Sequence, residues 1–448
     1  MLIENATILT IDPTDTIHAP GWLRIEEGRI EAVSARPLVP RPGEPRIDAT
    51  DLVVMPGIVN SHTHLFQTLL RGVYEGLPFV DWLRRIYHCG LALGEDDFRL
   101  AARLGAVEAL RSGTTTIVEH HFLNGAADGP SATLEGLASM GVRAVLARTS
   151  MDIGELAPAD LLETPARAVA AAERLIGERR RNDGRDGMVT LMVGPNTPGI
   201  SAGPEMAIAM SDLAESLGVG QSMHVAESRS VLEAVRSRYG VDGVIRWLDG
   251  IGALRGRILA AHSVHVDEGE RAIMAERRVS MAHNPVSNLY LGDGFAPVAE
   301  ARDAGVTVGL GTDGAASNNS QDMFEVLKLA ALLQRARLED GQILPAREAL
   351  RLATVDGARA IGLDQLIGSV EPGKRADLVV LDLLHRASTV TLHDVTSQIV
   401  HCASAANVWM VIVDGEVRLA DGQLVNEDEA GLLAEAQAAG RALASRLA

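Results

Sequence analysis

The sequence predicts an α/β fold, in which a closed (β/α)8 (TIM-type) barrel is joined to a small β domain. Apolar, strand-like runs alternate with helical patterns through the middle of the chain, and eight such runs can be counted. Short alternating strands occur at both ends of the chain. Regular alternation of strands and helices predicts a parallel sheet, and eight units of this average length predict its closure into a barrel.

Both ends of the chain contain short strand-like runs separated by turn signals. Residues 6–10 alternate between polar and apolar side chains, and Glu27-Gly28 is a turn signal between two further strand-like runs. Asp414-Gly415 is a hairpin signal after the apolar run 408–413. We therefore expect residues 1–55 and 366–425 to form one composite sheet domain. Residues 426–448 are expected to form a C-terminal helix that starts at Asn426, with Glu429 placed for a capping box.

The barrel is expected over residues 56–365. Helical patterns separate or follow its strands, because apolar residues recur there with helical spacing. The strand-like runs are residues 53–59, 114–118, 143–147, 189–193, 219–223, 257–261, 279–282 and 306–311, and examples of the helical patterns are residues 98–111, 205–217, 268–276 and 323–337.

Charge and composition exclude several classes of protein. The net charge is −18, which argues against a general nucleic-acid binder and against a binder of anionic membranes. Cys89 and Cys402 do not make a disulfide framework. The N-terminus lacks the pattern of a signal peptide, and no apolar run is long enough to span a bilayer. We expect a cytoplasmic protein with neither a nucleic-acid nor a membrane partner.

Two histidines, His62 and His64, follow the first barrel strand. In an extended chain, residues i and i+2 point to the same side, so both imidazoles are directed to one place. Imidazole is the commonest protein ligand of divalent transition metals. For an isolated pair of histidines a solvated strand end would be the better interpretation, so the ends of the other strands decide the matter.

Polar, metal-capable side chains follow the other predicted strands as well. The working residues of a barrel lie at the C-terminal ends of its strands, so these side chains should converge. His120, His121 and His283 could equally be supporting or loop residues. The strand-end residues are His62, His64, Glu119, His120, His121, Arg148, Asn196, His224, Glu227, His262, His283, Asn284 and Asp313. Among them, three imidazoles and one carboxylate suit Zn²⁺ or Fe²⁺: His62, His64, His224 and Asp313.

Several longer motifs carry a family resemblance. They are Pro56-Gly57-Ile58-Val59-Asn60-Ser61-His62-Thr63-His64, Met223-His224-Val225-Ala226-Glu227, Ala261-His262, His283-Asn284-Pro285-Val286-Ser287-Asn288, Gly311-Thr312-Asp313-Gly314-Ala315-Ala316-Ser317-Asn318 and Gly373-Lys374-Arg375-Ala376-Asp377-Leu378. Over nearly its whole length the chain resembles the amidohydrolase superfamily, and within it the metal-dependent deaminases and triazine hydrolases. The resemblance implies a barrel with a β-sandwich made from both termini and, by analogy, a homodimer.

The resemblance also implies the metal site and the reaction. His62, His64, His224 and Asp313 would hold one divalent ion, with Zn²⁺ expected and Fe²⁺ the alternative. Strand four ends at Asn196 without the lysine of two-metal relatives, so we infer a mononuclear site. The expected reaction is hydrolysis of a C–N bond in a cyclic amidine. Asp313 and His262 would orient a water and take its proton, while Glu227 would carry a proton to a ring nitrogen before ammonia leaves.

The substrate is expected to be a small heterocycle. Gln67 completes an H-x-H-x-x-Q motif, and in guanine and 8-oxoguanine deaminases a glutamine at this place reads the ring amide. A carboxamide offers both a donor and an acceptor, so it can pair with an N–C=O edge. A glutamine facing water is the alternative. Trp82, Arg148 and Asn196 are further substrate-binding candidates, with a structural ion pair as the alternative for Arg148.

S-adenosylhomocysteine and methylthioadenosine deaminases are the alternative within the family. Two departures from that group favour a free ring, namely an oxopurine, a pterin or an s-triazine. Leu91 stands where the group has a ribose-binding glutamate, and Asn196 stands where it has a histidine. Loss of chloride or an alkylamine from a triazine is a further alternative. A cyclic-amide hydrolase would need the bridging lysine, and a scaffold without activity would be expected to lose a ligand or Glu227.

Overall fold

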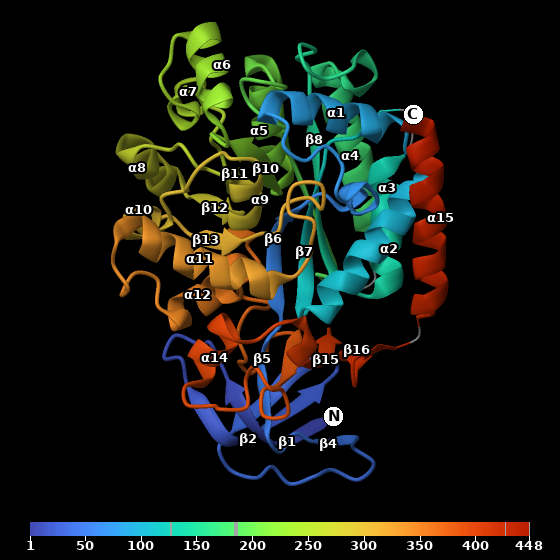
Figure 1. The fold of residues 1–448 in the computed structure, drawn as a ribbon, viewed down its shortest axis with the longest axis vertical. Helices are drawn as coiled ribbons and strands as arrows, with labels where there is room; N and C mark the ends of the chain where they lie inside the picture. The colour runs from blue at the N-terminus through green and yellow to red at the C-terminus, as the bar shows by residue number, and fades with distance from the viewer. Residues whose placement is uncertain (126–127, 183–186, 426, 448) are drawn as a thin grey trace.

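The structure is a computed structural model that describes residues 1–125, 128–182, 187–425 and 427–447. A large barrel lies above a smaller sheet that contains both ends of the chain's β structure, as Figure 1 shows. The last helix runs along the outside of the barrel. None of the helices in these described ranges is long and apolar enough to cross a membrane.

The barrel consists, within the described residues, of eight parallel strands whose order in the sheet follows their order in the chain. At the seam between the first and last strands the Asp313 amide donates to the His62 carbonyl at 2.9 Å. The predicted barrel is therefore confirmed. Its strands are β6 (Ile58–Thr63), β7 (Thr114–His121), β8 (Arg143–Ser150), β9 (Val189–Pro195), β10 (Gly220–Val225), β11 (Ile258–His262), β12 (Val279–His283) and β13 (Val308–Leu310).

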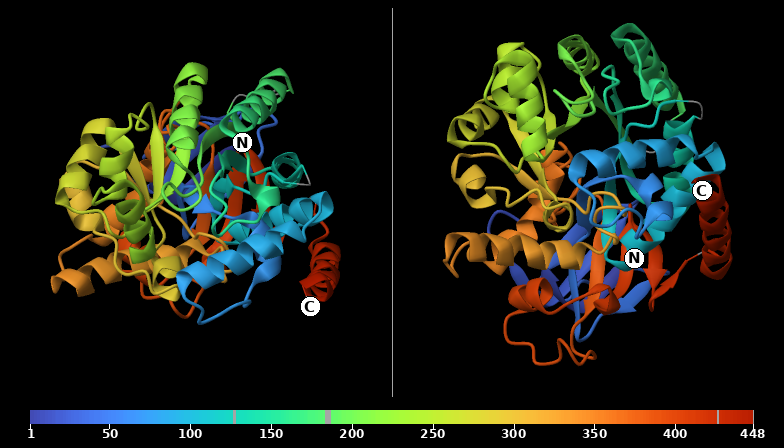
Figure 2. Two further views of the ribbon diagram at one scale, coloured as in Figure 1. Left: turned by 90° about the horizontal axis from the view of Figure 1, so that it is seen from above. Right: turned by 45° about the horizontal axis from the view of Figure 1, so that its top comes forward.

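Helices cover the outside of the barrel, as the view from above in Figure 2 shows. The helix predicted from Phe98 begins earlier, at Glu95, because Asp97 accepts from the Gly94 amide at 2.9 Å and three acidic residues occupy its positive end. The elements are η1 (Leu65–Leu70), α1 (Phe79–Leu91), α2 (Glu95–Arg111), α3 (Gly129–Met140), η2 (Ala159–Leu161), α4 (Pro165–Asn182), α5 (Pro204–Leu217), α6 (Arg229–Tyr239), α7 (Val244–Gly250), α8 (Glu268–Arg277), α9 (Pro285–Tyr290), α10 (Val298–Asp303), α11 (Met323–Leu338), α12 (Ala346–Leu352) and α13 (Val355–Ala360).

The second sheet joins the two ends of the chain. The strand 378–382, from the C-terminal part of the chain, pairs antiparallel with the strand 52–56, and Leu378 lies opposite Pro56. The predicted sheet domain made from both termini is thus present, with α14 (Val395–His401) and η3 (Ala405–Asn407) between two of its strands. Its strands in the described chain are β1 (Leu2–Leu9), β2 (Ile17–Glu26), β3 (Arg29–Ser34), β4 (Arg46–Asp48), β5 (Leu52–Pro56), β14 (Leu378–Asp382), β15 (Val408–Val413), β16 (Glu416–Ala420) and β17 (Gln423–Leu424).

The predicted single strand 53–59 was wrong, because it is two strands that belong to different sheets. β5 pairs with β14 in the terminal sheet, and β6 pairs with β7 in the barrel. Gly57 lies between them, and a Cβ at this position would come within 2.2 Å of the Thr115 hydroxyl. Only glycine fits where the chain crosses so close to β7.

The central strand β5 of the terminal sheet is buried on both faces. Val53 and Met55 pack into the core shared with the barrel, while Leu52 and Val54 pack into the terminal domain's own core. Successive side chains of a strand point to opposite faces, so this strand serves two cores. The sheet therefore supports the N-terminal end of the barrel.

A buried ion pair links the sheet to the barrel. Arg143, the first residue of β8, donates from Nε to Asp377 Oδ2 at 2.7 Å and from Nη2 to Asp377 Oδ1 at 2.9 Å. Both side chains are almost fully buried. This bidentate geometry gives the Asp377 motif a structural role at the junction.

The last helix, α15 (Glu429–Leu447), packs against α2. Asn426, from which the sequence predicted it to start, lies outside the described residues. Glu429 is bonded to Arg111 and Arg446 to Asp97. These partly exposed pairs position the helix and add little stability each.

Candidate active site

Four side chains from distant parts of the chain converge at the C-terminal end of the barrel. His62 and His64 Nε2 each lie 3.3 Å from Asp313 Oδ1. His64 Nε2 lies 3.2 Å from His224 Nε2. All four side chains are buried. The structure therefore brings together the four residues that the sequence singled out as metal ligands.

Backbone carbonyls fix the proton positions on two of these imidazoles. His64 Nδ1 lies 2.7 Å from the carbonyl oxygen of His120, and His224 Nδ1 lies 3.0 Å from that of Asn196. A carbonyl oxygen only accepts, so each Nδ1 carries the hydrogen and each Nε2 presents a lone pair. Two lone pairs that face each other at 3.2 Å repel unless a cation lies between them.

A divalent metal ion fits this arrangement better than a proton. Burial lowers the pKa of His64 and takes the pKa of His224 well below its usual value, which disfavours the imidazolium form. Among the described residues, His62 Nε2 and Asp313 Oδ1 have no hydrogen-bond partner. Ligands about 2.0–2.1 Å from a tetrahedral zinc are separated by about 3.3 Å, close to the measured distances. The donor set is therefore suited to one divalent ion.

Two serines orient the ligand carboxylate. Ser287 Oγ donates to Asp313 Oδ2 at 2.6 Å, and Ser317 Oγ donates to the same oxygen at 2.9 Å. Burial alone would raise the pKa of Asp313, but the neighbouring imidazoles hold it well below its usual range. Oδ2 is thus occupied while the ionised Oδ1 faces the imidazoles.

Glu227 and His262 form a pair of proton carriers beside the ligands. Glu227 Oε1 lies 3.5 Å from His262 Nε2. Burial raises the pKa of Glu227 well above its usual value, and the charges of Asp293 and Asp313 add to the effect. Burial lowers the pKa of His262 to about 3. These shifts favour the neutral carboxyl, which can donate a proton, and the neutral imidazole, which can accept one.

The backbone is constrained at two of these positions. His262 has a φ of 67° and Asp313 a φ of 61°, both in the left-handed region. Non-glycine residues held there cost about 1–3 kcal/mol each and cluster at functional sites. The constraint directs both side chains into one cavity.

The cavity over the site is small and walled on one side by α1. Its volume is about 20 Å³, room for roughly one water molecule. A heterocyclic ring is larger than this volume, so its binding requires the cavity to widen. The cavity is lined by His64, Gln67, Phe79, Trp82, Leu83, Ile86, Phe122, Asn196, Thr197, His224, Glu227, His262 and Asp313.

Gln67 and Trp82 both line this cavity. Gln67 Oε1 accepts from the Ala316 amide at 3.1 Å, and its Nε2 has no hydrogen-bond partner within the described chain. Trp82 Nε1 is buried and also lacks a partner among the described residues. Both side chains therefore keep donors that a ligand in the cavity can use.

Asn196 also lines the cavity, but its amide is already bonded. Its Oδ1 lies 3.1 Å from His120 Nε2, and its Nδ2 lies 3.2 Å from the hydroxyls of Tyr87 and Ser201. Its carbonyl, in turn, holds His224. This geometry favours a role in positioning the metal ligand rather than direct contact with a substrate.

Arg148 does not line the cavity of the metal ligands. Its Nη2 donates to Glu163 Oε1 at 2.7 Å and its Nη1 to Ser150 Oγ at 2.9 Å. Arg148 is buried and Glu163 is partly buried, and both line a separate cavity. This position corresponds to the structural ion pair that was the alternative to substrate binding.

Some residues of the site carried no recognisable sequence signal. Ser287 and Ser317 lie inside the family motifs, but a serine alone does not indicate a carboxylate partner. His120 is a supporting residue, since its ring is bonded to Asn196 and, through Nδ1 at 2.9 Å, to Ser222. Phe79 and Phe122 form the cavity wall. Their packing depends on where α1 folds, which the sequence does not specify.

Comparison with known proteins agrees with this geometry. A family model described as "Amidohydrolase family" matches residues 53–418. A 5-methylthioadenosine/S-adenosylhomocysteine deaminase from Pelotomaculum thermopropionicum is 39% identical over 98% of this chain and 97% of its own length. A 5'-deoxyadenosine deaminase from Methanosarcina mazei is 33% identical over 100% of this chain and 99% of its own.

Solved structures share the whole fold. A zinc-bound adenosine deaminase from Xanthomonas campestris has a TM-score of 0.88 at 31% identity, and the match covers 100% of this chain and 98% of the other. A zinc complex of atrazine chlorohydrolase from Arthrobacter aurescens has a TM-score of 0.92 at 28% identity, covering 98% and 99%. Both structures contain zinc, so similar folds hold a divalent metal.

Proposed function

The chain belongs to the amidohydrolase family, and we propose that it is an aminohydrolase that releases ammonia from an amino-substituted nitrogen heterocycle. The observation that carries the proposal is the pair of facing imidazole lone pairs, His64 and His224 Nε2, 3.2 Å apart beside Asp313. Relatives of nearly full length are named deaminases, which supports the same class of reaction.

The cation is proposed to be Zn²⁺, with Fe²⁺ as the alternative. His62, His64, His224 and Asp313 supply three nitrogens and one oxygen, a donor set that zinc accepts. Zinc in two solved structures of the same fold supports this choice. When bound, such an ion lowers the pKa of a water molecule, so that attack on a ring carbon becomes feasible near neutral pH.

The protein side chains move the protons in this proposal. Glu227, protonated because its pKa is raised, donates to a ring nitrogen and makes the adjacent carbon electrophilic. His262 and Asp313 orient the attacking water and take its proton. The amino group gains a proton and leaves as ammonia while a ring carbonyl forms, so water and the amine are exchanged without an oxidant.

The walls of the cavity favour a free ring as substrate. Leu91 is not among the lining residues, and the amide of Asn196 is bonded to protein groups. A ribose hydroxyl would therefore find no free partner at Asn196, whereas Leu91 lies outside the cavity wall and favours neither substrate. Gln67 and Trp82 offer N–H donors to the ring itself. An oxopurine, a pterin or an s-triazine fits these features.

A nucleoside is the second candidate substrate. The observation in its favour is the 39% identity, over 98% of the chain, to a relative named for methylthioadenosine and S-adenosylhomocysteine. The same residues would perform the same hydrolysis on an adenine ring that carries a ribose. Other side chains would then have to bind the ribose in place of the glutamate and histidine of the S-adenosylhomocysteine and methylthioadenosine deaminases.

Ammonia release from the metal-loaded enzyme distinguishes the two candidates. The free-ring substrates of the panel are guanine, a pterin and an amino-s-triazine. The nucleosides are 5'-methylthioadenosine, S-adenosylhomocysteine and 5'-deoxyadenosine. Higher kcat/KM on the free rings is the expected result. Turnover of the nucleosides alone would establish the second candidate. An absence of ammonia from both sets, with metal bound, would reject the deaminase proposal.

A further inference from the structure

A second cavity opens at the opposite end of the barrel from the metal-ligand set. It lies at the N-terminal ends of three strands, since Arg257 directly precedes β11, Val279 begins β12 and Thr307 directly precedes β13. Its volume is about 600 Å³, within the range of small-molecule sites. It is lined by Gly256, Arg257, Met274, Ala275, Arg278, Val279, Ser280, Gly305, Thr307, Arg359 and Gly362.

The lining of this cavity is cationic in a protein whose net charge is −18. Arg257, Arg278 and Arg359 contribute guanidinium groups, and the described residues that line it include no carboxylate. Ser280 and Thr307 add hydroxyl groups. Positive potential concentrated in a concave surface attracts small anions.

Two of the three guanidinium groups form no ion pair within the described part of the chain. Arg257 is partly buried, its Nε is buried without a partner, and it packs so closely over Gly362 that a Cβ there would lie 1.7 Å from Nη1. Arg278 is exposed and ends α8 in the left-handed conformation. Arg359 is paired, at 2.5 Å, with Asp356. Burial lowers the pKa of Arg257, and the charge of Asp364 offsets this only in part without forming an ion pair, so the partly buried guanidinium is incompletely compensated.

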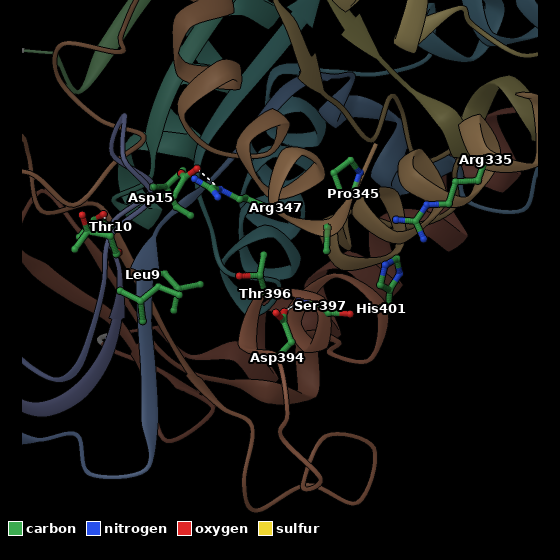
Figure 3. Close-up of a pocket in the computed structure, with 14 residues that line it drawn as sticks. Leu9, Thr10, Asp15, Arg335, Pro345, Arg347, Asp394, Thr396, Ser397 and His401 are labelled. Atoms are coloured by element: carbon green, nitrogen blue, oxygen red, sulfur yellow. Dashed lines mark hydrogen bonds and ion pairs between the residues drawn. The ribbon is translucent and has the colours of Figure 1, made fainter. Parts of the chain in front are cut away.

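The cavity shown in Figure 3 provides a comparison within the same protein. It lies between the terminal sheet and the α11, α12 and α14 region, and its volume is about 540 Å³. There Arg347 is paired with Asp15, and Arg335 donates to the carbonyls of Ile343 and Leu344 at 3.0 and 3.2 Å. The lining of that cavity includes the carboxylates of Asp15 and Asp394, whereas the described lining of the cavity of Arg257 and Arg278 includes none.

We propose that the cavity of Arg257 and Arg278 binds a phosphate dianion, either free or as the monoester of a small organic group. Guanidinium groups bind phosphate oxygens in a bidentate manner, and hydroxyls such as those of Ser280 and Thr307 complete such sites. The volume exceeds that of one phosphate. The apolar side chains of Met274 and Val279 offer a wall for an attached organic group.

Calorimetric titration of the metal-loaded enzyme with inorganic phosphate tests the proposal. We expect saturable binding by the wild type, and at least a tenfold loss of affinity in Arg257→Met and in Arg278→Met. Arg36→Met, which removes an exposed charge on the terminal sheet domain, is the matched control and should bind as the wild type does. Phosphate bound at the metal centre would persist in all three variants. A loss of affinity in Arg257→Met and Arg278→Met alone therefore reports binding in this cavity.

A second measurement separates binding from a merely structural role. Without phosphate, Arg257→Met should be at least as stable as the wild type, because it removes a partly buried charge that forms no ion pair, and it should lose the stabilisation that phosphate gives the wild type. Glycerol 3-phosphate binding more tightly than phosphate, with no binding of glycerol, would identify a monoester; equal affinities would identify free phosphate. Unchanged phosphate affinity in both variants, or no saturable binding in the millimolar range by the wild type, would overturn the proposal.

Discussion

Replacement of Glu227 by glutamine tests the proton transfer on which the proposed reaction depends. The side chain is buried beside His262, with 3.5 Å between Oε1 and Nε2. Burial raises its pKa well above the usual value, which favours the neutral, protonated carboxyl. Glutamine matches its size and its charge but cannot give up a proton to the ring. General acid catalysis contributes about 10²–10⁴ in rate, equivalent to about 3–5 kcal/mol of activation free energy.

The expected result is a loss of kcat of that size with bound metal and thermal stability unchanged. Ammonia release measures kcat, and elemental analysis of the same sample measures the metal. Glu233→Gln, on the exposed face of α6, is the matched control and should retain full activity. Activity of Glu227→Gln within threefold of the wild type at equal metal content would refute the reasoning. Loss of metal would instead make Glu227 a ligand.

Three other predictions concern the support of the site, the Arg148 ion pair and the pH dependence of stability. The double variant Ser287→Ala/Ser317→Ala should bind metal about 10–100-fold more weakly in chelator competition, because the ligand carboxylate loses both hydrogen bonds to its second oxygen; retained affinity would contradict this role. Arg148→Met should destabilise the protein by about 1–3 kcal/mol, since the partly buried Glu163 loses its cationic partner and keeps only Ser150 and Asn124 as donors, while kcat/KM stays within twofold; a selective rise in KM would place Arg148 at the substrate. Burial raises the pKa of Asp293 to about 7. Between about pH 4 and 7 the folded state therefore holds a proton that the unfolded chain has released. The free energy of unfolding falls as the pH rises through this window. Asp293→Asn should therefore melt above the wild type at pH 8 and with it at pH 4, and equal melting temperatures at both values would exclude the shift.

The barrel and its ligand set were accessible from the sequence because both follow from simple periodicities. Alternation in a strand directs His62 and His64 to one side, and parallel strands bring all their carboxyl ends to one face. The structure places His224 and Asp313 at that face as expected. The fold class needed only the succession of strands and helices.

Tertiary contacts explain where the sequence was less informative. The apolar run 53–59 reads as one strand, and only the pairing of β5 with β14 and of β6 with β7 divides it between two sheets. Arg148 stands at a strand end like the other candidates. Its partner Glu163 comes from the loop after η2, and the sequence around Arg148 does not predict that contact.

The proton positions at the site depend on groups that no side-chain pattern records. The carbonyl oxygens of His120 and Asn196 determine that His64 and His224 present lone pairs to each other. Any residue at positions 120 and 196 would supply a carbonyl, so the two side chains do not account for this part of the site. The Asn196 amide and the His120 ring instead bond to each other, which links the end of β7 to the residue after β9 across the intervening strand β8. A strand-end residue can therefore support a metal site through its backbone, whatever its side chain, as Asn196 does for His224.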